Sequence, residues 1–347
     1  MSARRTQEPE PGEWRAIVDI GAVSTALLLT DGNERIRRSV DTHLGAGTVA
    51  PSGDTVAAPI AAASLDRLRA VLVDYRALAD DKHASIRAIG SSPARRASNR
   101  AEFQAVIADT LGVALDAVGG ADEARLSFAG ACSGLPGDGA GLHPPDQTVV
   151  TIDLGGGSTD FAAGRSAASV DAWSVPIGGV LVAKTYFESD PPDPAELSAA
   201  LSVIELHLDD LRREAPALAT AVADPDAIVI GLGGVVTIAA VEVGLLDVDP
   251  LNGDGDGPLH DFVLERAAVE DVFRTLATES RNDRAHNPGL APSRVDDIVG
   301  GCAVLVETMR QFGIDEVTVS QRGLADGALA AGARVLTDAS GDLAENR

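Results

Sequence analysis

Aromatic residues and cysteines are scarce in this sequence. Phenylalanine, tryptophan and tyrosine together make up 3% of the 347 residues, and there are 2 cysteines, Cys132 and Cys302. These two lie far apart and outside any CxxC or Cys/His cluster, which argues against both a zinc scaffold and a disulfide framework. The core must therefore be built from Ala, Val, Leu and Ile, and the 36 glycines predict many tight turns. This composition is typical of an α/β protein.

Long apolar runs are also missing. No stretch approaches the roughly 18 uninterrupted apolar residues that a membrane-spanning helix needs. The first residues, MSARRTQEPEPGEW, lack the apolar middle of a signal peptide. We therefore expect a cytoplasmic protein without a membrane partner.

Basic residues are few relative to acidic ones. The chain has 28 Lys and Arg against 52 Asp and Glu, a formal net charge of -24. Such a balance argues against a general nucleic-acid binder, which needs a basic face. An anionic ligand would instead depend on glycine-rich loops, helix N-termini, a few arginines and a divalent metal. One basic group, Arg35, Arg37 and Arg38, is interpreted as an exposed strand edge kept soluble by charge, in preference to a landing patch for polyphosphate.

One local pattern occurs twice along the chain: a short apolar strand ends in an aspartate that glycine follows. Asp19 precedes Gly21 in the first half, and Asp153 precedes three glycines in the second. The duplication predicts two related domains facing a cleft. We place them at 14–128 and 129–324, between a disordered tail at 1–13 and a second tail at 337–347, with a helix near 325–336 as a candidate addition to the first domain. Further expected elements are strands at 86–89, 227–230 and 316–319 and helices at 58–80, 100–112, 194–214, 266–278 and 295–312.

The segment VTIDLGGGSTDF, residues 150–161, carries the most chemical information. Its strand ends at Asp153, and glycines 155–157 let the backbone approach an anion closely with successive N–H groups. Ser158 and Thr159 add hydroxyl groups, and Asp160 returns a second carboxylate near the first. A bare glycine turn is usually structural. The strand, Asp, GGGST and Asp in register instead predict a site for phosphate and a metal ion.

DLGGGSTDF resembles the second phosphate loop, DIGGGSTE, of the exopolyphosphatase / guanosine pentaphosphate phosphohydrolase (Ppx/GppA) family. The segment GADEARLSFAGA, residues 120–131, is similar to the GxEEARLxFxG segment of that family, and this similarity makes Glu123 the candidate general base. Other matches are AIVDIGAVSTALLL (16–29) to DxGSNSxRLLV, GSSPARRASNR (90–100) to TSAxRxAxNR, IGLGGVVTIAA (230–240) to GxxGTxTxLAA, and DEVTVSQRGLADG (315–327) to EVxVSxxGLRxG. The likeness therefore spans almost all of residues 15 to 335.

This resemblance implies two actin-like α/β domains (ASKHA, RNase H-like) with an interdomain cleft. It implies release of the terminal phosphate of inorganic polyphosphate, with Mg²⁺ or another divalent cation as cofactor. The open alternatives are hydrolysis of guanosine pentaphosphate, a regulatory module that binds without turnover, and an actin-like kinase or ATPase, and a homodimer is a candidate assembly. The implied site residues are Glu123 as catalytic base, Asp153, Asp160 and Asp19 as metal ligands, and Gly21, Ser24, Arg95, Gly155, Gly156, Gly157, Ser158, Thr159, Gly233 and Gly234 as phosphate-binding groups.

The sequence also departs from the family pattern. Ala22 and Val23 stand where the first loop would offer Ser and Asn, and Val235 replaces a Thr. His43 replaces an Arg, so a permanent cation becomes one that is charged only when protonated. Asp160 is one methylene shorter than the usual Glu. Each lost hydrogen bond to a charged group is worth about 1.5–3 kcal/mol, so we expect a weaker grip on substrate and reduced activity.

Overall fold

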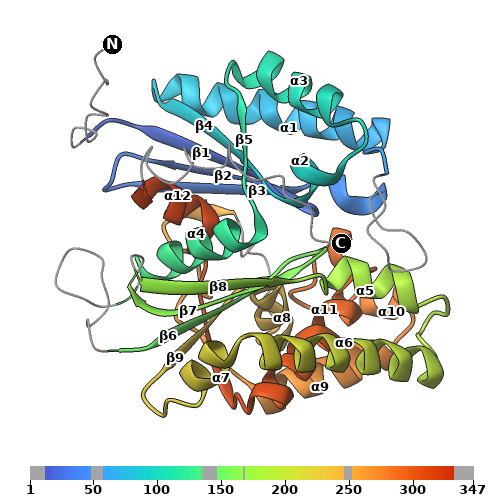
Figure 1. Ribbon diagram of the computed structural model, residues 1–347. Coiled ribbons are helices and arrows are strands. Elements are labelled where there is room, and N and C mark those ends of the chain that lie inside the picture. The colour runs from blue at the N-terminus through green and yellow to red at the C-terminus, as the bar shows by residue number, and fades with distance from the viewer. Residues whose placement is uncertain are drawn as a thin grey trace.

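The protein contains two six-stranded mixed sheets with helices packed on their faces (Figure 1). The computed structural model describes residues 12–47, 58–133, 135, 147–166, 169–245 and 252–331. Nearly all of the predicted N-terminal tail, the predicted tail at 337–347 and the part of the last helix beyond residue 331 lie outside these residues. Within the described part of the chain, no helix is long and apolar enough to cross a membrane.

The first sheet is built mainly from the N-terminal part of the chain. Its strands β1, β2 and β3 form an antiparallel meander, while β4 and β5 run parallel to β1 on the other side. The strand order is β10-β3-β2-β1-β4-β5. Alternate residues of β1 and β2 pack against helices α1 and α3, which cover one face. The bounds are β1 Arg15–Ile20, β2 Ser24–Thr30, β3 Arg35–Asp41, β4 Ser85–Gly90, β5 Leu115–Ala117, β10 Gly253–Asp254, α1 Ala62–Asp81 and α3 Arg100–Leu111.

The second sheet repeats this topology. Strands β6, β7 and β8 form an antiparallel meander, β9 and β12 continue parallel to β6, and β11 adds an antiparallel edge. Helices α5 to α9 and α11 pack on one face (Figure 1). The predicted duplication is confirmed by the order of five strands that the two sheets share, which is that of an actin-like domain, while β10 and β11 extend opposite edges of the two sheets. The bounds are β6 Val149–Leu154, β7 Thr159–Ser166, β8 Ser169–Val175, β9 Ile228–Gly233, β11 Val263–Glu265, β12 Glu316–Val319, α5 Gly179–Tyr186, α6 Pro194–Glu214, α7 Pro216–Val222, α8 Gly234–Glu242, α9 Arg266–Thr278 and α11 Ile298–Phe312.

Helices α4 (Gly120–Cys132) and α12 (Leu324–Ala331) lie between the two sheets (Figure 1). α4 buries Ala124 and Phe128 against the second sheet, and Leu126 packs with α12 residues against the first sheet. The two helices cross where Gly130 meets Gly327: a Cβ on either glycine would lie within 2 Å of a backbone oxygen of the other segment. The predicted domain boundary at 128/129 falls inside α4, so the domain limits remain a proposal.

The edge of the first sheet differs from the sequence interpretation. β3, which carries the basic group, is paired with β10 from the second half of the chain. Arg35 and Arg37 bind the carboxylate of Asp326 in α12, whose side chain is 2% exposed. The interpretation as an exposed strand edge was therefore wrong, because it treated β3 without the distant segments that cover it.

Candidate functional site

Two glycine loops at matching places in the two sheets form the core of the site. The β1–β2 loop is closed by a hydrogen bond from the Gly21 amide to the Ser24 carbonyl oxygen, 2.9 Å long. In the β6–β7 loop, the Gly155 amide donates to the Ser158 carbonyl oxygen over 2.9 Å. The two loops are therefore closed by the same hydrogen bond, although the first loop carries Ala22 and Val23 between its glycine and its serine.

A third glycine segment joins β9 to helix α8. Gly233 is the N-cap of α8 and has a φ of 63°, in the left-handed region. A Cβ at this position would lie 2.6 Å from a carboxylate oxygen of Asp153 and 2.7 Å from the Leu154 carbonyl oxygen. Only glycine therefore allows the N-terminus of α8, with its free N–H groups and positive dipole end, to approach the second phosphate loop this closely.

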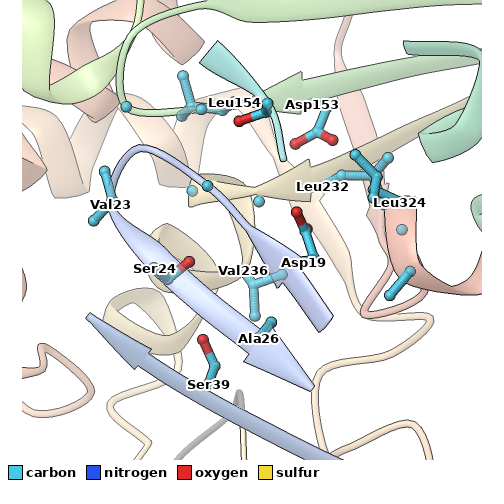
Figure 2. Close-up of a pocket in the computed structure, with 18 of the residues that line it drawn as sticks. Asp19, Val23, Ser24, Ala26, Ser39, Asp153, Leu154, Leu232, Val236 and Leu324 are labelled. Atoms are coloured by element: carbon cyan, nitrogen blue, oxygen red, sulfur yellow. The ribbon is translucent and has the colours of Figure 1, made fainter. Parts of the chain in front are cut away.

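A cleft of about 250 Å³ lies between the two sheets where these loops meet (Figure 2). It is the place where an open α/β sheet binds ligands, next to the strand ends. Most of the sequence-predicted site residues line it, namely Asp19, Gly21, Ser24, Glu123, Asp153, Gly155, Gly156, Gly157, Ser158, Gly233 and Gly234.

The carboxylates of Asp19 and Asp153 point toward one another across this cleft (Figure 2). Each strand alternates its side chains, so Asp19 and Asp153 both face the layer between the sheets that α4 and α12 partly fill. Burial, with a smaller contribution from the charge of Asp153, raises the pKa of Asp19 to about 7. Burial also raises the pKa of Asp153, while a 2.7 Å hydrogen bond from the Ser127 hydroxyl opposes that rise. The site therefore favours a bound positive charge or a shared proton.

Glu123 approaches the cleft from the first turn of α4. Burial raises its pKa well above the ordinary value of 4.5, and the charges of Asp160, Asp19 and Asp153 add to the rise. Arg95 opposes it, with a guanidinium nitrogen 3.7 Å from a carboxylate oxygen of Glu123. A carboxyl group with a raised pKa beside a phosphate site has the chemistry of a general base.

Three predicted site residues do not line the cleft. The hydroxyl of Thr159 is buried and donates to the Ile177 carbonyl oxygen at 2.5 Å. Arg95 donates to the Val118 carbonyl oxygen and pairs with Glu123. Asp160 lies opposite Asp153 in the β6–β7 register, is 4% exposed, and has its pKa raised to about 7, chiefly by burial. Two of them adjoin lining residues directly, because Arg95 pairs with Glu123 and Asp160 is the cross-strand neighbour of Asp153.

Other polar residues of the cleft were not found from the sequence. Arg37 and Ser39 come from β3, Thr237 from α8 and Arg294 from the 3-10 helix η2 (Pro292–Arg294). For Arg37 the sequence did contain a signal, the basic group at 35–38. The sequence interpretation placed that group on an exposed strand edge instead of in the cleft. Arg294 lies in a segment without glycines or alternation, so nothing local marked it.

The departures from the family pattern occupy different surroundings. Ala22 and Val23 line the cleft, and Val23 packs on the backbone of Gly156. Val235 belongs to the first turn of α8, is fully buried in the core and does not line the cleft. Desolvation, the largest cause, lowers the pKa of His43 below 6.5, and its side chain does not line the cleft. The weaker substrate binding predicted from Val235 and His43 therefore cannot come from a direct contact with a ligand in the cleft.

The donor set suits a hard divalent cation. No group of three or more His, Cys, Asp or Glu side chains within the described residues has the arrangement of a complete metal site. Mg²⁺, however, usually keeps several waters and binds one or two carboxylates together with substrate phosphates. The facing carboxylates of Asp19 and Asp153 fit that mode. Asp160 has a buried carboxylate oxygen without a hydrogen-bond partner in the described structure, and it is the cross-strand neighbour of Asp153 on the same face of the sheet.

These features define a protein of two actin-like domains with a cleft between them that is lined by glycine loops and carboxylates, and comparisons with known proteins identify its family. The sequence model of the Ppx/GppA phosphatase family matches residues 36–333. The chain therefore belongs to the Ppx/GppA phosphatase family.

Individual relatives agree with this assignment. The chain is 32% identical over 326 residues to exopolyphosphatase 2 of Mycobacterium tuberculosis, covering 90% of this chain and 96% of the relative. The crystal structure of an exopolyphosphatase-like protein matches with a TM-score of 0.78 and 25% identity, covering 93% of this chain and 100% of that one. A Ppx/GppA enzyme of Aquifex aeolicus matches in fold, with a TM-score of 0.69 and 24% identity, covering 92% and 99%.

Proposed function

We propose that this protein hydrolyses the terminal phosphate from inorganic polyphosphate. The observation that carries the proposal is the cleft in which Glu123, Asp19 and Asp153 converge on two phosphate loops of matching geometry. Support also comes from the relative at 32% identity, which is named an exopolyphosphatase.

In this proposal the backbone N–H groups of Gly156 to Ser158 and the N-terminus of α8 hold the phosphate to be released, while the Gly155 amide closes the loop on the Ser158 carbonyl oxygen. Because these dipoles are fixed by the fold, they stabilise the charge on the transferred phosphoryl group without reorganising. Glu123 accepts a proton from the attacking water, and its raised pKa brings its basicity closer to what proton transfer at neutral pH requires.

Asp19 and Asp153 would hold a divalent cation, taken here as Mg²⁺. Such a cation would neutralise charge on the phosphate oxygens and relieve the repulsion between the two carboxylates. Ser127 orients Asp153 by donating to it. Asp160, Arg95 and Thr159 are not part of the cleft lining and would act as supporting residues. Arg95 pairs with Glu123, Asp160 lies beside Asp153, and Thr159 binds the Ile177 carbonyl oxygen.

The test is release of inorganic phosphate from long-chain polyphosphate with Mg²⁺, run beside guanosine pentaphosphate and ATP. We expect polyphosphate to give the highest kcat/KM, and Glu123→Gln to lower kcat by about 10²–10⁴-fold. Asp122→Asn is the matched control, since this acid lies next to Glu123 on the same helix but is exposed and paired with Arg125.

Two results would change the assignment. Faster release from guanosine pentaphosphate would make the protein a guanosine pentaphosphate phosphohydrolase. If the parent protein binds polyphosphate tightly yet releases no phosphate, the protein is a binding module.

A further inference from the structure

An ion pair joins the two halves of the protein at the cleft. Asp41 is the last residue of β3, and Arg294 ends the 3-10 helix η2 of the other half. The Arg294 Nε lies 3.0 Å from Asp41 Oδ2 and its Nη2 lies 2.8 Å from Asp41 Oδ1, a bidentate geometry. The Ser293 hydroxyl donates to the same carboxylate. The side chains are 12% and 16% exposed, so water screens this pair only partly.

Arg294 also faces the phosphate loops. It lines the main cleft and a smaller cavity of about 30 Å³ behind it, and Gly155, Gly156 and Thr237 line both of these spaces. A guanidinium group carries five N–H donors. Asp41 accepts hydrogen bonds from two of them. Among the described residues, it is the only hydrogen-bond acceptor of the Arg294 side chain. The remaining donors are available to an anion held by the glycine loops.

We propose that Asp41 is a positioning and specificity residue, which holds Arg294 across the cleft and competes with bound phosphate for it. The inference rests on the proposed function in one respect: the ligand is a phosphate chain. The Asp41 carboxylate offsets the positive charge of Arg294. The electrostatic attraction between Arg294 and a single phosphate ion is therefore small. A ligand with several linked phosphates carries enough charge to displace Asp41 from Arg294. Asp41 therefore favours phosphate chains over the single phosphate that hydrolysis releases.

The first test measures binding without turnover. The probe is methylenediphosphonate, a diphosphate analogue that cannot be hydrolysed at the bridge, titrated with Mg²⁺ into the full-length protein by calorimetry. We expect Asp41→Asn to lower its Kd at least threefold and that of inorganic phosphate by a larger factor. Asp80→Asn is the control, because Asp80 pairs with Arg76 on the exposed face of α1.

A double-mutant cycle tests whether Asp41 acts through Arg294. In an Arg294→Met background, Asp41→Asn should no longer change the Kd of either probe. An equal effect in both backgrounds, or unchanged or weaker binding in Asp41→Asn alone, would overturn the proposal.

The second test measures the distance between the two halves. Spin labels at Val73→Cys on α1 and Leu206→Cys on α6 use positions that are 54% and 58% exposed, while the native cysteines are buried. Without ligand, Asp41→Asn should give a broader and longer distance distribution than the parent. Identical distributions, together with no binding of either probe to any variant, would also overturn the proposal. Failure of the parent to release phosphate would instead contradict the proposed function alone.

Discussion

At the scale of single residues, Asp19 is an acid placed where ionisation is unfavourable. Its pKa in the folded protein is about 7, against an ordinary value of 3.8, because it is buried and faces Asp153. A group whose pKa is raised by folding contributes stability that is complete below its unfolded pKa. That stability is lost as the pH rises through the folded pKa. The ionised form of Asp19, which the proposed metal binding requires, therefore lowers the stability of the folded protein unless a cation is bound.

This cost predicts how stability depends on pH and metal. In EDTA, we expect the Tm to fall between pH 5 and pH 8, and Mg²⁺ to restore part of the loss at pH 8. Asp19→Asn cannot ionise, so it should be more stable than the parent at pH 8 by up to about 4 kcal/mol, the value of a rise in pKa from 3.8 to about 7, and show a flatter pH profile. Differential scanning fluorimetry would measure this, and parallel profiles for the two proteins would contradict it.

At the scale of secondary structure elements, the crossing of α4 and α12 is a backbone contact. A Cβ on Gly327 would lie 1.8 Å from the Leu126 carbonyl oxygen, and one on Gly130 would lie 1.9 Å from the Gly323 carbonyl oxygen. Both obstacles are backbone atoms, which cannot rotate away as a side chain can. The helices must therefore separate if either glycine is replaced.

We expect Gly327→Ala to lower the free energy of unfolding by about 3 kcal/mol through this overpacking. Urea denaturation followed by circular dichroism would give the value. Gly323→Ala is the control, because nothing lies within 4 Å of a Cβ at that position. A similar loss of stability in both variants would show that the crossing is not the cause.

Elements with strong local patterns were predictable from the sequence. The helices at 194–214 and 266–278 and the strand at 316–319 agree with α6, α9 and β12 residue for residue. The first two are amphipathic, and α6 also begins with a capping box at Asp193. β10 was not predicted, because a two-residue strand owes its existence to pairing with β3 and to Asn252, which binds the Ser39 backbone.

The candidate site shows the same division. Asp19, Asp153 and the glycines occupy strand ends, and the backbone dictates where such residues point, so the motifs placed them in the cleft. For Thr159 and Arg95 the motif gave the position but not the direction of the side chain. Arg294 and Asp41 meet only through the packing of the two halves, which no local pattern contains.

At the scale of the whole molecule, a partly buried network of charges joins the two halves beside the cleft, and two of its members, Arg37 and Asp326, line that cleft. Asp326 in α12 binds Arg35 and Arg37 in β3, with nitrogen–oxygen distances of 2.6 and 2.7 Å. Arg322 binds Asp256 with two hydrogen bonds of 2.8 and 2.7 Å, and Arg37 approaches the same carboxylate at 3.5 Å. The network fixes α12 and β10 to the first sheet.

Asp326→Asn should lower the free energy of unfolding by about 3–5 kcal/mol, because it leaves two partly buried guanidinium groups without their shared carboxylate. Thermal unfolding would measure the loss. Asp315→Asn removes an exposed acid, 84% accessible, that pairs with Arg266, and should change stability by less than about 1 kcal/mol. A small effect in Asp326→Asn would mean that water replaces the lost contacts.

The pairing of β10 with β3 has a consequence for the order in which the chain folds during synthesis. β3 ends at residue 41, but its partner is made only at residues 253–254. At a translation rate of about 5–20 residues per second, roughly 10–40 s pass between the two. During that time the nascent first sheet exposes an open edge on the ribosome. Arg35 and Arg37 are then without Asp326, and their uncompensated charges protect that edge from pairing with another nascent chain.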